Sequence, residues 1–143
     1  MAALAAPRVT NPWGSLYASR AIPVADNVKI YPGALVVINA SGYCEPATAA
    51  AAKIAAGAYR GTRILDNTVT GHAAAAFDVP VDMGTFKFDN KGGDLVTQAM
   101  VGAACYMEDD HTVRLTSTAT SAAGKVHRLD ADGVWVSVSL PLF

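Results

Sequence analysis

The chain has 143 residues, with 11 lysines and arginines against 12 aspartates and glutamates and a formal net charge of −1 at pH 7. This length favours one domain with a core of its own, and the absence of a basic cluster argues against nucleic-acid binding. No run of about 18 apolar residues occurs, and the first residues lack the pattern of a secretory signal, so we expect no membrane partner. Charged residues make up 16% of the chain, against about 25% in an ordinary soluble domain, which predicts a surface that is partly covered by a partner.

Residues 1–27 differ from the rest of the chain. They contain three of the seven prolines and follow neither a strand nor a helix period, yet large apolar residues occur in them, among them Trp13, Leu16, Tyr17 and Ile22. Disordered tails are usually poor in aromatic residues. The segment is therefore predicted to be an extended N-terminal docking arm, which packs either on its own domain or on a neighbouring subunit.

A hairpin follows the arm. Residues 28–30 alternate as a short strand, and residues 31–34 place Pro before Gly, as a type II turn requires. Residues 35–38 are a β-branched run suited to a core strand, and residues 39–46 supply a turn and a returning strand.

The alanine-rich residues 47–57 are ambiguous. Alanine favours helix, and Thr48 and Gly57 are suitable residues to begin and end a short one. Ile54 is the single bulky apolar residue in the segment, and so short a helix is marginal without packing. We expect one or two helical turns here, or an ordered loop.

The remaining residues predict further short strands separated by turn residues. The predicted strands are residues 58–65, 77–81, 85–89, 101–107, 112–115, 125–129 and 134–138. The strongest hairpin signal is the Asp-Ala-Asp-Gly sequence at residues 130–133. Many short strands with at most one short helix predict an all-β fold, a small β-sandwich or barrel of antiparallel strands with an extended N-terminal arm.

The apolar C-terminal tail, residues 139–143, reads Ser-Leu-Pro-Leu-Phe. It either completes the core of its own domain or docks on a neighbour, since exposed apolar ends mark contacts. Leu142 and Phe143 are therefore candidate contact residues, together with the four apolar residues named in the arm.

The candidate catalytic and metal-binding features are weak. Residues 108–111, Glu-Asp-Asp-His, carry ligands suited to a hard cation, but they lack the alternating order of a calcium loop and are interpreted as a solvated hairpin turn. The three histidines, His72, His111 and His127, show no spacing that requires a triad or a metal site. We expect no enzyme, no cofactor and no metal.

Two cysteines, Cys44 and Cys105, lie in predicted strands with apolar neighbours. Two cysteines do not make a disulfide framework, and neither has a visible base beside it. They are predicted to be reduced, buried residues of a protein that is made in a reducing cytoplasm.

Short blocks of residues follow one another in a fixed order over residues 27–138: residues 32–36, 59–61, 66–68, 84–88, 101–107, 109–113, 123–126 and 132–136. In this order they resemble the capsid cement (head decoration) proteins of tailed bacteriophages. The resemblance implies that residues 28–138 are a β-rich cement domain on the outer surface of the virion. It implies that the chain is made in the host cytoplasm and that its partners are the major capsid protein and copies of itself, as trimers or dimers. The family offers no catalytic residues to carry over.

A β-sandwich module that binds carbohydrate or a receptor on a phage particle is the alternative. Such modules often present a flat aromatic platform, for which Trp13 and Trp135 are the candidates. Trp135 stands between Val134 and Val136 and faces opposite to both. We interpret Trp135 as a core residue; if the valines face the core instead, Trp135 lies on the outer face.

Overall fold

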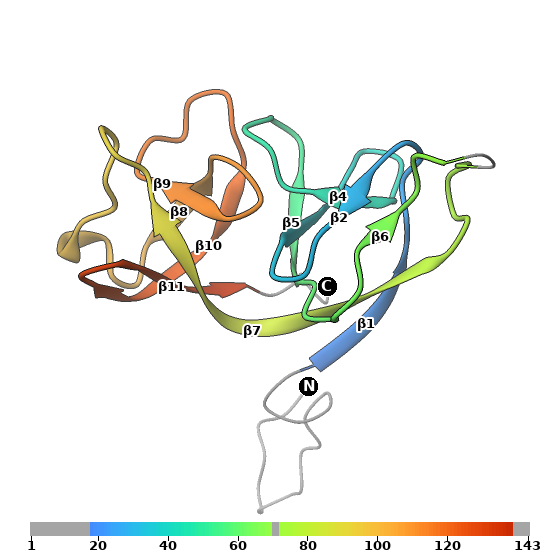
Figure 1. Ribbon diagram of the computed structural model, residues 1–143. Coiled ribbons are helices and arrows are strands. Elements are labelled where there is room, and N and C mark those ends of the chain that lie inside the picture. Colours follow the sequence, from blue (N-terminus) through green and yellow to red (C-terminus); the bar gives the residue numbers. More distant parts are fainter. Residues whose placement is uncertain (1–17, 70–71, 139–143) are drawn as a thin grey trace, which may run out of the picture.

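The computed structural model describes residues 18–69 and 72–138. Over these ranges the chain forms eleven strands and one short 3-10 helix, η1 Gln98–Met100, which confirms the predicted all-β fold (Figure 1). The short helix is not where alanine content favoured one. Residues 47–53 form turns and loops, and strand β5, Ile54–Ala58, follows them.

Five strands close into a barrel. They are β7 Asp78–Asn90, β8 Ala104–Met107, β9 Thr112–Arg114, β10 Ala122–Asp130 and β11 Gly133–Val138. The order around the barrel is β7-β9-β8-β10-β11, and β11 pairs with β7 to complete the circle. Every pairing is antiparallel except the short parallel contact between β7 and β9.

The barrel interior is a close-packed apolar core. Along β11, Val134, Val136 and Val138 are buried, while Ser137 between them is exposed. This alternation is the period of a strand with one face on a core. The rest of the cluster comes from β3, β7 to β10 and nearby loops: Leu35, Val37, Ala47, Phe88, Val96, Cys105, Met107, Val113, Ala123 and Val126.

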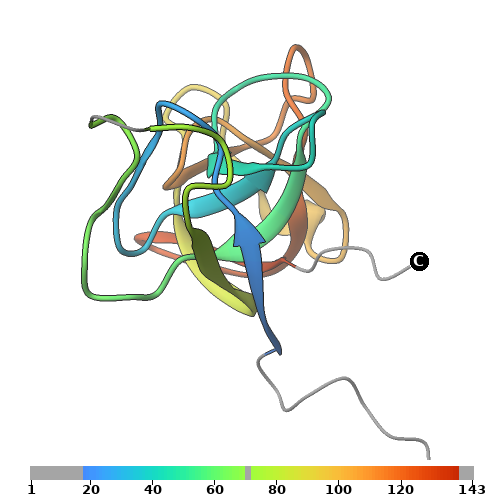
Figure 2. The same ribbon diagram turned by 90° about the vertical axis from the view of Figure 1, so that its right-hand side faces the viewer.

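A second lobe extends from the N-terminal half of β7 (Figure 1). It contains β1 Ala18–Pro23, β3 Leu35–Ile38, β4 Cys44–Pro46 and β5, all joined in the same sheet system. Strands β2 Lys29–Ile30 and β6 Leu65–Asp66 form a separate pair, and the segment around β6 runs along one side of this lobe (Figure 2). Its own core is Ile22, Val24, Ile30, Ala34, Val36, Cys44, Ala56, Tyr59, Val79 and Val81.

Strand β3 lies between the two cores. Leu35 and Val37 point into the barrel core, and Val36 points into the core of the second lobe. All three side chains are fully buried. A strand covered on both faces has no need of polar residues, which explains its uninterrupted apolar run.

Several of the predicted strands have different limits in the structure. Residues 77–81 and 85–89 were expected as two strands, but β7 continues through both, with Val81 in one core and Phe88 in the other. Residues 58–65 were expected as one strand, and this prediction is wrong. Within them Tyr59 is buried and its hydroxyl donates to the carbonyl oxygen of Arg63 at 2.8 Å, which holds a loop.

The predicted boundary of the arm at residue 27 is also wrong. Strand β1 pairs with β7 from Ala18 opposite Met83 to Pro23 opposite Asp78. Val24, directly after it, is fully buried in the second core. Residues 18–27 therefore belong to the domain, because paired and buried residues are part of its core rather than of a free arm. The remainder of the predicted arm, residues 1–17, lies outside the described residues.

Candidate binding surface

Of the six predicted contact residues, Ile22 lies in the described part of the chain. Its side chain is 5% exposed and packs in the second core beside Val79 and Val81. The prediction that Ile22 contacts another subunit is therefore wrong, because its strand turns it inward against β7. The other five predicted residues fall outside the described ranges: Trp13, Leu16, Tyr17, Leu142 and Phe143.

The two terminal segments that carry these five residues begin at the same place on the domain. Ala18, the first described residue, pairs with Met83, and Val138, the last, pairs with Gly84. Met83 and Gly84 are neighbours in the middle of β7. The segments before Ala18 and after Val138 are therefore both attached to the middle of this long strand.

Trp135 lies on the outer face of the barrel. Val134 and Val136 on either side of it are fully buried, whereas Trp135 is partly exposed. The expectation that Trp135 is a core residue is wrong, because the two valines take the inward positions of the strand. The indole Nε1 donates to a carboxylate oxygen of Asp130 at 2.7 Å, which fixes the ring against the barrel.

An open cavity of about 340 Å³ brings two aromatic rings and two cations together. The guanidinium carbon of Arg60 is 5.9 Å from the centre of the Phe86 ring, and the Lys87 ammonium is 6.0 Å from that of Trp135. Cation–π contacts at this range stabilise by about 0.5–1 kcal/mol at exposed sites. The cavity therefore has aromatic walls with positive charge beside them.

The acidic groups beside Trp135 are held in their charged form. The hydrogen bond from Trp135 lowers the pKa of Asp130, and Arg128 and Lys87 add to this effect. Lys87 likewise lowers the pKa of Asp132 by a hydrogen bond and by its charge. Lys87 and Trp135, which line the cavity, are thus joined to a network of charges of both signs at neutral pH.

The turn at residues 109–111 joins β8 to β9. Asp109, Asp110 and His111 each offer one possible metal-ligand atom, and these atoms lie within 4.8 Å of one another. The same atoms bond within the turn: the carboxylate of Asp109 accepts from the backbone N–H of His111 at 2.9 Å, and His111 Nδ1 lies 3.0 Å from Asp110 Oδ1. These contacts are typical of a surface turn, the interpretation drawn from the sequence.

The cysteines are separated and buried. Cys44 lies in the core of the second lobe, Cys105 lies in the barrel core, and both are free thiols, as predicted. Burial raises the pKa of each thiol to about 12. Since the thiolate is the reactive form, neither cysteine is suited to be a nucleophile at neutral pH.

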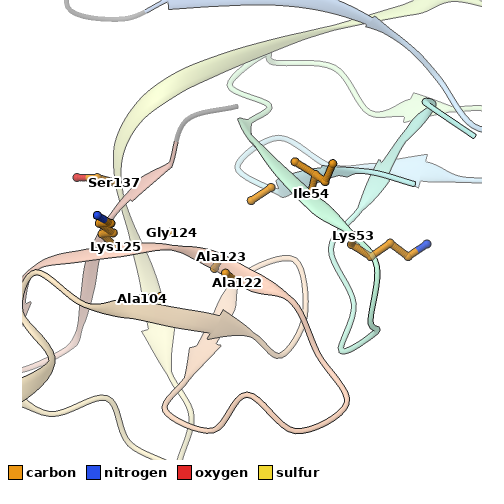
Figure 3. Close-up of a pocket in the computed structure, with 9 residues that line it drawn as sticks. Lys53, Ile54, Ala104, Ala122, Ala123, Gly124, Lys125 and Ser137 are labelled. Carbon is orange, nitrogen blue, oxygen red and sulfur yellow. The ribbon is translucent and has the colours of Figure 1, made fainter. Parts of the chain in front are cut away.

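A second and larger hollow, of about 550 Å³, lies between β5 and β10 (Figure 3). Its lining includes Lys53, Ile54 and Ala55 on one side, Ala123 and Gly124 on the other, and Ser137 of β11. Ile54 is 49% exposed at its rim. This groove was not foreseen from the sequence, because its walls come from segments far apart in the chain.

No protein-family model, no curated protein and no solved structure matches the chain. Over residues 18–69 and 72–138, no helix is long and apolar enough to cross a membrane. The resemblance to capsid cement proteins therefore rests on the blocks of sequence alone.

Proposed function

We propose that the chain is a structural virion protein that binds the outside of a tailed-phage head and stabilises junctions between major capsid protein subunits. The proposal rests on the positions, within the fold, of the sequence blocks that resemble cement proteins. Residues 84–88 belong to β7, residues 101–107 include β8, residues 109–113 include most of β9, residues 123–126 belong to β10 and residues 132–136 include most of β11. The blocks thus reach all five strands of the barrel, in chain order.

The attachment of the terminal segments supports a docking role. Both begin at the middle of β7, so the apolar residues of the two segments start from one region of the domain. Burying a large apolar side chain contributes roughly 1.5–3 kcal/mol. Trp13, Leu16, Tyr17 and Phe143 together offer enough apolar area to hold the domain on a neighbouring capsid protein or on another copy of itself.

Such a protein acts by mass action and needs no catalytic group. A subunit that binds the assembled shell, and not the separated subunits, stabilises the shell by RT ln(1 + [L]/Kd) at each site, about 2.7 kcal/mol when the free concentration is 100 times Kd. Many sites on one head add their contributions. The buried thiols and the turn-bound carboxylates described above are consistent with a role that requires no chemistry.

Binding to heads that lack decoration tests the proposal. The full chain is mixed with undecorated heads of the source phage and co-sedimentation is measured. The double variant Trp13→Ala/Tyr17→Ala is expected to bind at least about tenfold more weakly, since about 1.4 kcal/mol corresponds to a factor of ten. Tyr31→Ala is the matched control, because Tyr31 is an exposed aromatic residue (49%) of the folded domain. A full chain that does not sediment with heads contradicts the proposal.

Carbohydrate binding is the second candidate function, and the outward position of Trp135 favours it. An indole ring beside an open cavity with Arg60 and Lys87 is suited to stack on a sugar and to bind its polar groups. A glycan array probed with the full chain and with Trp135→Ala tests it. Glycan binding that Trp135→Ala abolishes supports this second function, and an array with no binding removes it.

A further inference from the structure

The groove between β5 and β10 is a place where the barrel core reaches the surface. Ala123, which lines it, is a fully buried member of that core, and Ala55 packs against the same cluster. Because both are alanines, the floor of the groove is apolar and has little side-chain volume above it. Ile54 at the rim adds exposed apolar surface. The groove therefore suits aliphatic side chains.

Several residues of the groove walls have a partner strand on one side, although β5 also pairs with β7 at Ala58 and β10 also pairs with β11 from Lys125 onward. Ile54 and Ala55 of β5 pair with Ile38 and Val37 of β3, and Ala122 of β10 pairs with Tyr106 of β8. Among the described residues, no strand pairs with these residues on their other side. Extended chain that enters the groove would therefore lie beside two strand edges.

Strand β11 ends at this groove (Figure 3). Ser137 lines it, and Val138, the last described residue, follows directly. The next five residues are Ser-Leu-Pro-Leu-Phe. Five extended residues span at most about 18 Å, so the tail is long enough to reach across a groove that begins at its own base.

The alternation of β11 sets which tail residues would face the floor. Val134, Val136 and Val138 point into the barrel core, and they belong to the cluster that includes Ala123. If the same period of two continues, Leu140 and Leu142 take the core-facing positions. Ser139, Pro141 and Phe143 then take the outward positions.

We propose that residues 139–142 lie in the groove of their own chain, with Leu140 and Leu142 packed over Ala55 and Ala123. The tail of the same chain is favoured over that of a second copy because a short connection gives an effective concentration in the millimolar range. This inference does not depend on capsid binding. It leaves Phe143 on the outward side, where the proposed docking role needs it.

Cysteine cross-linking of the full-length protein tests the position of the tail. The pair Ile54→Cys/Leu142→Cys is oxidised with glutathione disulfide, which accepts the two electrons and two protons released as the S–S bond forms. The control pair is Leu95→Cys/Leu142→Cys, because Leu95 is an exposed leucine (53%) that does not line the groove. We expect a bridged monomer to form at least about tenfold faster from the first pair, measured by mass spectrometry without reductant.

The other outcomes overturn the proposal. Bridged dimers from the Ile54→Cys/Leu142→Cys pair would show that the tail of a second copy occupies the groove, and bridging at the control rate would show that no tail does. The native cysteines do not interfere, since both are buried. If the cross-link does not form, the proposal that the chain binds phage heads still stands. If the chain does not bind heads, the proposal about the position of the tail still stands.

Thermal melting gives an independent test of which tail residues face the groove and which face outward. Leu140→Ser is expected to lower Tm by roughly 5–10 °C, because it removes a buried aliphatic side chain from a domain of this size. Phe143→Ser, the outward control, is expected to change Tm by less than about 2 °C. Equal shifts for the two variants would overturn the proposed facing of the tail.

Discussion

The thiol of Cys44 donates to the carbonyl oxygen of Ile22, with 3.5 Å between sulfur and oxygen. Both residues are buried in the core of the second lobe, one on β4 and the other on β1. Strand β1 is thus held by its ladder with β7 and by a buried contact with β4. It closes one side of a core, although its sequence resembles an extended arm.

Two truncated proteins test where the arm ends and the domain begins. Deletion of residues 1–17 is expected to leave a folded protein, whereas deletion of residues 1–24 removes the buried side chains of Ile22 and Val24. Each contributes roughly 1.5–3 kcal/mol, and domains of this kind are stable by only about 5–15 kcal/mol. Circular dichroism melting should show a marked loss of Tm for the longer deletion. Equal melting of the two truncated proteins would contradict the assignment of β1 to the core.

The two thiols should react only after unfolding. Burial raises the pKa of Cys44 and of Cys105 to about 12, so at pH 8 few thiolates form and reagents have no access to them. Titration with Ellman's reagent should find no rapidly reacting thiol in the native protein and two in denaturant. Fast reaction of either thiol under native conditions would place that residue at the surface.

His111 should titrate above the ordinary histidine range. The hydrogen bond to Asp110 raises its pKa, and the charges of Asp109, Asp110 and Asp89 add to the effect. Because the folded pKa exceeds the unfolded one, the stabilisation is fully present below the unfolded pKa and disappears as pH rises through the folded pKa. The ring is 64% exposed, so the titration itself is the sensitive measurement and the change in stability is small.

NMR titration of the His111 ring is the appropriate readout. Asp110→Asn is expected to lower the midpoint, because it removes the negative charge and changes the partner of Nδ1. Asp94→Asn is the matched control, since Asp94 accepts from Thr116 on another part of the surface. A midpoint that is the same in the wild type and in Asp110→Asn would show that the contact within the turn does not form in solution.

The barrel strands were largely predictable from the sequence. One face of β11 lies on a core and the other is solvated, so its apolar and polar residues alternate. This alternation, with the turn residues before it, predicts the strand. Strand β5 was not predicted from the sequence, because its own residues do not favour a strand. Its sequence, Ile-Ala-Ala-Gly-Ala, has low intrinsic preference for strand, and pairing with β3 supplies the conformation.

The features of the candidate surface depend on contacts that sequence periodicity does not contain. The sequence left two positions open for Trp135, in the core or on the outer face of the strand. The buried positions of Val134 and Val136 decide for the outer face. The groove between β5 and β10 and the common origin of the terminal segments depend on the register of β7 with its partners. Such registers join residues that lie far apart in the chain.

Gly57 should tolerate no side chain. A Cβ at this position would lie 2.2 Å from the carbonyl oxygen of Asp82, where β5 crosses β7, and its φ of +153° is one that other residues rarely adopt. Gly57→Ala is expected to lower the free energy of unfolding by at least about 2 kcal/mol, the range typical of overpacking and backbone strain. The matched control is Gly92→Ala, because a Cβ there meets nothing within 4 Å. Urea unfolding should place that control within about 0.5 kcal/mol of the wild type, and an equally mild effect of Gly57→Ala would show that β5 and β7 do not approach so closely.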